Sequence, residues 1–229
     1  MTSTSSFGDR LAGSPVLDTF RNHAFFEAVD RAELTREQAA VLIEQWWHPL
    51  HYFPTFLARC VAVLPDIASK SAITSILNQE AGGGDVRKAH EVIYADSMAR
   101  CGFDRARVTG TAPFPETAAL VDGYRRASEQ RESALGFIFA TENTDLLMVS
   151  SIGKAIERTT GVTGNEWVSI HVEQEPEHVE EAGHALLADF TAEEEDRVYH
   201  AADEMWRLWT AFFDRLAAEA DIKTSAAVA

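Results

Sequence analysis

Residues 171–178 read His-Val-Glu-Gln-Glu-Pro-Glu-His, and this stretch decides how the rest of the chain is interpreted. On a helix, His171, Glu175 and His178 stand at positions i, i+4 and i+7 and therefore share one face. Two imidazoles and one carboxylate on a narrow stripe can bind a borderline divalent metal such as Fe(II). Because one stripe leaves coordination positions open, we expect other segments to supply further ligands.

The composition favours a protein that acts on small molecules. The chain has 229 residues, of which 46% are hydrophobic, enough for one large core. Its formal net charge of −16 disfavours sequence-independent binding to nucleic acid or to an anionic membrane. No apolar run has the length of a signal peptide core or a membrane span, so we expect a cytoplasmic protein. Cys60 and Cys101 form no CxxC motif, and a disulfide framework or zinc cluster is not expected.

Helical periodicity runs through the chain, and no strand-type alternation is long enough to predict a sheet. Three capping boxes mark expected helix starts, at Thr35-Arg-Glu-Gln38, Thr163-Gly-Asn-Glu166 and Thr191-Ala-Glu-Glu194. The first opens a long aromatic-rich helix, the second precedes the 171–178 stripe, and the third opens the last helix. One further helix is expected over residues 16–29.

These elements predict an all-α fold, a single-domain bundle of about seven helices. The domain is expected to span residues 15–222. Residues 1–14, rich in Ser, Thr and Gly, and residues 223–229 are expected to be disordered ends.

Gly82-Gly83-Gly84 interrupts a helical region that extends from about residue 66 to about residue 100. Each glycine costs about 1 kcal/mol relative to alanine inside a helix, so we expect a break here. In a continuous helix, Glu80 and His90 would lie about 15 Å apart along the axis, too far to share one ion. Unwinding at the glycines can bring these two side chains together.

Glu142 lies in a polar cluster, Thr141-Glu-Asn-Thr-Asp145, inside an otherwise apolar helical stretch. A carboxylate on a buried face must be paired, protonated or bound to a metal. The candidates then comprise three carboxylates and three imidazoles: Glu80, His90, Glu142, His171, Glu175 and His178. Such a set fits two metal ions bridged by a carboxylate inside a helical bundle, and with reduced iron its use would be O₂ activation.

The stretch from Leu77-Asn-Gln-Glu80 through the glycines to His90, then Glu142, then His171-x₃-Glu175-x₂-His178, resembles the haem-oxygenase-like diiron oxidase family. The resemblance implies a haem-oxygenase-like fold, two Fe(II) ions held by the six candidates, and O₂ as co-substrate. It assigns catalytic roles to the carboxylates Glu80, Glu142 and Glu175.

The same resemblance implies natural-product chemistry on a small amino acid or amine, namely desaturation, C–N bond formation, N-oxygenation or C–C cleavage. The expected partners are this small-molecule substrate, an external reductant and a second copy of the chain, since the aromatic-rich last helix favours a homodimer. Neither nucleic acid nor a membrane is an expected partner.

Two positions depart from the family pattern. Glu175 stands where the family usually has Asp, and Pro176 removes a helical hydrogen bond and is expected to distort the ligand helix. Some family members use a seventh, carboxylate ligand, for which Glu44 is the candidate here.

Other interpretations of the same residues stay open. The 171–178 stripe could be an acidic, solvated helix face, or the ligands could follow the register Glu177, Glu181 and His184. His48 and His51, on the first long helix, are candidates for lining a substrate pocket.

A metal-independent, thiaminase-like or cofactor-free enzyme of the same fold is the alternative function. It would use Cys101, or Cys60, together with acid–base groups. A non-catalytic metal carrier is a third hypothesis. Haem is the least favoured ligand, because the glycines lie between two predicted iron ligands.

Overall fold

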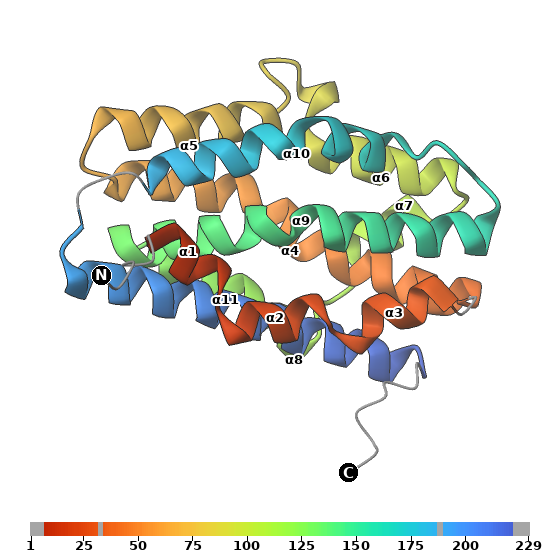
Figure 1. The fold of residues 1–229 in the computed structure, drawn as a ribbon. Helices are drawn as coiled ribbons and strands as arrows, with labels where there is room; N and C mark the ends of the chain where they lie inside the picture. Colours follow the sequence, from red (N-terminus) through yellow and green to blue (C-terminus); the bar gives the residue numbers. More distant parts are fainter. Residues whose placement is uncertain (1–6, 32–33, 187–189, 222–229) are drawn as a thin grey trace, which may run out of the picture.

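The computed structural model describes residues 7–31, 34–186 and 190–221. This part of the chain contains eleven α-helices, one short 3₁₀ helix and no strand (Figure 1). The all-α prediction is confirmed. Two of the four additional helices, α1 (Phe7–Ala12) and α7 (Arg105–Gly110), are only six residues long, too brief to show a hydrophobic period.

Five helices surround the site described below: α4 (Arg36–Val63), α5 (Ile67–Glu80), α6 (His90–Arg100), α9 (Arg131–Thr160) and α10 (Glu166–Ala185). The 3₁₀ helix η1 (Val86–Lys88) joins α5 to α6. The remaining helices are α2 (Pro15–Arg21), α3 (Ala24–Arg31), α8 (Pro115–Ala127) and α11 (Ala192–Glu219).

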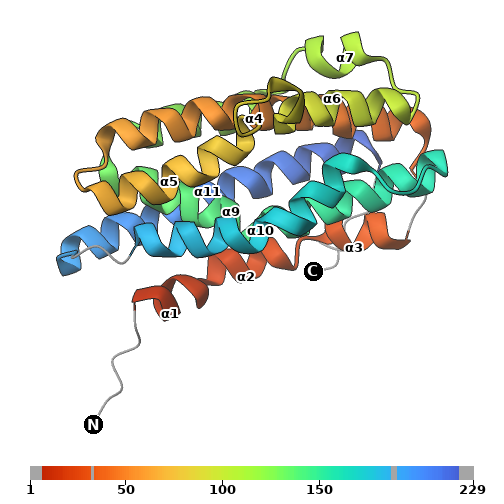
Figure 2. The same cartoon turned by 90° about the horizontal axis from the view of Figure 1, so that it is seen from above.

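Helix α9 is the centre of the bundle. It packs most extensively against α11 on one side and α10 on the other, and also contacts α3 and α4 (Figures 1 and 2). Gly136 permits the close approach to α11, because a Cβ at this position would lie 2.5 Å from the carbonyl oxygen of Val198. Helix α10 in turn packs on α5 and α6, so a side chain on its inner face meets three other helices.

Two of the three predicted capping boxes are confirmed. The side chains of Thr35 and Thr191 each accept a hydrogen bond from the backbone N–H three residues on. The side chains of Gln38 and Glu194 in turn accept from the backbone N–H groups of Thr35 and Thr191. The prediction of a capping box at Thr163 is wrong, because α10 begins at Glu166 and not directly after Thr163. Asn165 is the N-cap and accepts from the Val168 N–H.

The single helix predicted over residues 16–29 is two helices in the structure, α2 and α3. His23 divides them, since its Nδ1 accepts from the Phe25 N–H at 3.1 Å. The Nε2 of the same ring contacts Asp214 Oδ1 on α11 at 3.1 Å. A side chain that binds the backbone next to it competes with the helical hydrogen bonds and ends the helix.

The N-terminal boundary also differs from the expectation. Residues 1–14 were predicted to be disordered, yet α1 lies within them and its Leu11 is fully buried. Residues 1–6 and the predicted tail 223–229 lie outside the described residues. None of the helices described is long and apolar enough to cross a membrane.

Candidate metal centre

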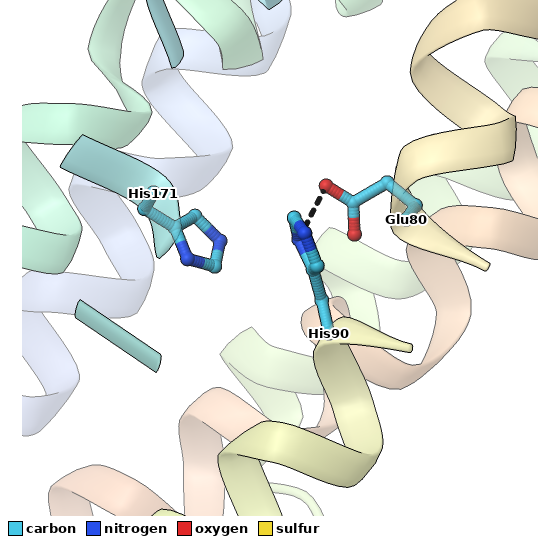
Figure 3. A group of neighbouring side chains, drawn as sticks. All are labelled: Glu80, His90 and His171. Carbon is cyan, nitrogen blue, oxygen red and sulfur yellow. Dashed lines mark ion pairs between the residues drawn. The ribbon is translucent and has the colours of Figure 1, made fainter. Parts of the chain in front are cut away.

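The triple glycine brings Glu80 and His90 together, as predicted. Glu80 is the last residue of α5 and His90 is the first of α6. Gly82, Gly83 and Gly84 all have positive φ, at 86°, 61° and 91°, and break the helical path between the two helices. As a result, His90 Nδ1 lies 2.9 Å from Glu80 Oε1, with His171 facing the pair from α10 (Figure 3).

The 171–178 stripe faces the interior. His171, Glu175 and His178 are each at most 4% exposed, on the side of α10 that packs against α9 and α5. Pro176 points to solvent, and α10 continues through it from Glu166 to Ala185. The helix is not interrupted at Pro176, and the three side chains share one buried face.

All six predicted ligands lie in two neighbouring groups, drawn from α5, α6, α9 and α10. Within each group the ligand atoms lie within 4.8 Å of one another. The groups adjoin, since the ring centroid of His90 is 4.7 Å from that of His171 and 6.3 Å from that of His178. The first group is Glu80, His90 and His171, and the second is Glu142, Glu175 and His178.

Each imidazole uses one nitrogen for a protein acceptor and directs the other into the group. His171 Nδ1–H donates to the Trp167 carbonyl oxygen at 2.7 Å, which leaves Nε2 free. His90 and His178 use Nε2 instead, 2.9 Å from the amide oxygens of Gln174 and Gln79. A ring held in this way presents a lone pair to a metal, as ligand histidines commonly do.

The second group and the adjacent Asp145 crowd three carboxyl groups into a buried space. Glu142 Oε1, Glu175 Oε1 and Asp145 Oδ2 are buried without a hydrogen-bond partner. Burial and the neighbouring carboxylates Asp145 and Glu142 raise the pKa of Glu175 far above its usual range. Burial and Glu142 also raise the pKa of Asp145, to about 7. Bound cations would neutralise these crowded carboxylates.

The charges of the imidazoles respond to the same surroundings. Burial acts to lower the pKa of His178, but the hydrogen bond and charge of Glu142 outweigh it and raise that pKa to about 9. For His171, burial and the adjacent His90 lower the pKa to about 4. Burial would raise the pKa of Glu80, yet His90 holds it at about 2.

Asp145 is a functional candidate that the sequence prediction missed. It lies one turn after Glu142 on α9, and its Oδ2 is 3.8 Å from the free Nε2 of His171. The spacing of three residues from Glu142 was the available signal, because it places both carboxylates on the same face of a helix.

The donor set fits a divalent metal of intermediate softness. It consists of imidazole nitrogens and carboxylate oxygens, without a thiolate, and it is buried among four helices. Such donors suit iron and related ions, whereas thiolate-rich sets select zinc clusters or iron–sulfur centres. The orphaned carboxylate oxygens are the atoms that such ions would satisfy.

A pocket adjoins both groups and has a largely apolar wall. Besides six acidic and imidazole side chains of the centre, it is lined by aromatic and aliphatic residues and two hydroxyls. The Tyr124 and Thr141 hydroxyl oxygens are 3.0 Å apart. No Lys or Arg of the described chain lines it. The other lining residues are Trp46, Pro49, Leu50, Phe53, Tyr124, Thr141 and Trp209.

Three residues considered from the sequence lie elsewhere. Glu44, the candidate seventh ligand, is buried but binds Arg107 at 2.8 Å and the Thr111 hydroxyl at 2.9 Å, so its charge is already matched. His48 and His51 line a different pocket, on the far face of α4. Helical geometry explains this, because Trp46 and Leu50 occupy the face of α4 that turns to the centre.

The rival register on α10 faces the solvent. Glu177 and His184 are exposed, and among the described residues the ionic neighbours of His184 are Glu180 and Glu181 of its own helix. This face of α10 is the acidic, solvated surface that the sequence also allowed.

Neither cysteine belongs to the centre. Cys60 and Cys101 are both buried, and neither lines the pocket beside the two groups. Burial raises the pKa of each thiol above its ordinary value. Reactive cysteines have lowered pKa values, so this environment favours structural thiols.

Comparison with known families agrees with this centre. Residues 40–210 match the family model described as "iron-containing redox enzyme". The protein belongs to this family. Among curated proteins, this iron-containing redox enzyme is similar to the 4-chloro-allylglycine synthase of Streptantibioticus cattleyicolor, with 26% identity over 137 residues. The match covers 58% of the present chain and 52% of that relative, so the chain spans about half the length of the relative.

Solved structures establish the fold class of the iron-containing redox enzyme. A CADD-like protein of unknown function from Nostoc punctiforme aligns with a TM-score of 0.78 at 18% identity, covering 93% of this chain and 95% of that one. A domain with a heme oxygenase-like fold from Shewanella denitrificans aligns with a TM-score of 0.70 at 21% identity, covering 96% and 91%. The predicted haem-oxygenase-like fold is thereby confirmed.

Proposed function

We propose that the protein is an O₂-dependent, non-haem diiron oxidase that acts on a small amino acid or amine. One observation carries this proposal, namely two adjoining buried groups of carboxylate and imidazole donors with orphaned carboxylate oxygens. Family membership supports iron and redox chemistry. Glu80, His90 and His171 would hold one Fe(II), and Glu142, Glu175 and His178 the other.

Charge balance is compatible with two ions. Glu80, Glu142, Asp145 and Glu175 carry four negative charges when ionised, and two divalent cations carry four positive ones. With a single divalent ion, two of the carboxylate charges would have to be matched by protons, for which the raised pKa values of Glu175 and His178 provide.

The metal pair would supply electrons to O₂ and generate the oxidant. The chain holds the neutral imidazoles in place, provides carboxylates that exchange protons, and excludes water with the aromatic wall of Trp46, Phe53 and Trp209. A dry, preorganised site of this kind directs oxidation to a C–H or N–H bond placed beside it and limits side reactions.

The pocket supports a substrate with an amino group. Its described lining offers a carboxylate, Asp145, and the hydroxyls of Tyr124 and Thr141, but no Lys or Arg. An ammonium or amine can donate hydrogen bonds to these oxygens and lie against aromatic faces. The relative that forms 4-chloro-allylglycine, an amino acid, supports the same class. Desaturation and C–N ring closure are the outcomes we favour, followed by N-oxygenation and C–C cleavage.

Iron stoichiometry and O₂ uptake after anaerobic Fe(II) loading test the metal centre. Wild type should bind about two irons per chain and consume O₂ rapidly. His178→Ala should lose at least one iron and the fast O₂ reaction. His184→Ala removes an exposed histidine from the same helix and should behave like wild type. Iron binding that is indifferent to His178 would exclude the proposed ligand set.

Incubation of the iron-loaded protein with amino acids and a reductant under O₂, followed by mass spectrometry, tests the substrate class. Loss of about 2 mass units indicates desaturation or ring closure, and a gain of about 16 indicates oxygenation. No mass change with any amino acid or simple amine would rule out the narrower proposal while leaving the metal centre standing.

A metal-independent enzyme that uses Cys101 is the alternative. It predicts activity that survives EDTA and disappears in Cys101→Ala. The position of Cys101 outside the pocket disfavours it.

A further inference from the structure

Gln79 and Gln174 stand in matching positions in the centre. Each immediately precedes a carboxylate of the centre, Glu80 in one case and Glu175 in the other. The amide oxygen of Gln79 lies 2.9 Å from His178 Nε2, and that of Gln174 lies 2.9 Å from His90 Nε2. The two contacts join α5 to α10 and α10 to α6.

The contacts cross between the two groups. Gln79 adjoins Glu80 of the first group but binds His178, which belongs to the second group. Gln174 adjoins Glu175 of the second group but holds His90 of the first. A shift of either helix turn that carries a carboxylate therefore also moves a histidine of the other group.

An amide oxygen can only accept a hydrogen bond, so each bonded Nε2 carries the proton. The lone pair of the neutral ring is then on Nδ1. In His90, this atom faces Glu80 Oε1 at 2.9 Å. In His178, it faces Glu142 Oε2 at 3.4 Å. These are the positions from which a metal beside the carboxylate would be bound.

Packing alone does not explain the two glutamines. Both are only partly buried, whereas His90 and His178 are 1% and 2% exposed. A neutral amide also fixes the ring without adding a fifth negative charge to a centre that already contains four carboxylates.

We infer that Gln79 and Gln174 are positioning residues, which hold His178 and His90 in the metal-binding tautomer and link the two metal sites to each other. This inference rests on the proposed two-metal function. It adds to that function a pair of residues outside the ligand set, through which occupation of one site affects the other.

Anaerobic titration with Co(II), followed by its ligand-field absorption, tests the inference without turnover. Gln79→Leu and Gln174→Leu should each weaken binding at the affected site by 10- to 100-fold, the usual effect of removing a ligand's hydrogen-bond partner. Their absorption bands should shift as the released ring reorients. Gln79→Glu keeps an acceptor and should restore the wild-type bands and most of the affinity.

Gln45→Leu is the matched control. Gln45 is a buried amide that binds the Phe114 N–H at 2.8 Å and the Thr117 hydroxyl at 2.7 Å, away from the ligands. Circular dichroism should show that all variants are folded. Wild-type affinity and bands in both Leu variants, or an equal loss of affinity in Gln45→Leu, would overturn the inference. Failure of the wild type to bind Co(II) would instead refute the two-metal function on which it rests.

Discussion

If His178 is a ligand as proposed, metal binding should depend on pH. The charge and hydrogen bond of Glu142 outweigh burial and raise the pKa of His178 to about 9. Near neutral pH the metal-free protein therefore keeps a proton that a metal ion must displace. Apparent affinity should rise by about tenfold per pH unit for each displaced proton, and the contribution of His178 should level off above its pKa. Metal titrations from pH 6 to 9.5 measure this slope, and an affinity that does not change with pH would contradict it.

Asp145→Asn should stabilise the metal-free protein. Burial and the charge of Glu142 raise the pKa of Asp145 to about 7, so its ionisation is less favourable in the folded than in the unfolded chain. A carboxyl with a raised folded pKa costs stability as pH increases from its unfolded value, near 4, to its folded value, near 7.

The variant should lack this loss and gain about 4 kcal/mol above pH 7 in the presence of a chelator, from about three pKa units at about 1.4 kcal/mol each. Urea unfolding at several pH values measures the difference. Asp122→Asn, which removes an exposed carboxylate from α8, is the control and should not reproduce the gain.

At the scale of elements, the break between α5 and α6 should be sensitive to one added methyl group. A Cβ on Gly82 would lie 2.3 Å from the Asp85 carbonyl oxygen and 2.6 Å from the Ala89 nitrogen. Gly82→Ala should therefore cost about 3 kcal/mol or more and separate Glu80 from His90, with loss of metal at the first group. Thermal unfolding and metal content measure the two effects.

Gly84 provides the comparison for that substitution. Its φ is also positive, at 91°, but a Cβ there would meet nothing within 4 Å. Gly84→Ala should cost only about 1–2 kcal/mol of backbone strain and keep the metal. Equal effects at the two glycines would show that the close contact at Gly82 has no role.

The elements near the centre could be predicted because strong local signals mark them. The glycine run implied a break, and the i, i+4, i+7 spacing placed three ligands on one face of α10. The division at His23 was missed, because it depends on a contact with Asp214, which is 191 residues away in sequence. Gln79 and Gln174 were missed for the same reason, since their contacts exist only after α5, α6 and α10 have packed together.

The whole molecule should be stabilised by metal. The ligands come from four helices and are assembled only in the folded chain, so an ion that binds there favours the native state. At a free metal concentration about a thousand times the dissociation constant, the gain is about 4 kcal/mol. Calorimetry with Mn(II) or Fe(II) and with EDTA measures it, and His178→Ala should abolish most of the shift. An unfolding temperature unaffected by metal would contradict a buried site.

Local patterns in the sequence predicted the helical bundle. The function class could be predicted only by combining ligand candidates from segments far apart in the sequence. Periodicity and capping fixed the long helices α4 and α11. The sequence does not show which helix faces pack together. Glu44 was therefore a candidate for the centre, although in the structure it pairs with Arg107. A buried carboxylate has the same sequence signature whether a cation side chain or a metal neutralises it.

The connection between Glu80 and His90 also offers a protease a place to act. Arg87 and Lys88 lie on η1 with exposed side chains, and trypsin cleaves after such residues. A cut here would leave Glu80 on one fragment and His90 and His171 on the other. Metal that ties Glu80 to His90 would hold the segment closed, so cleavage should slow as the centre fills. Metal-free protein should therefore be cut faster within the segment that joins Glu80 to His90.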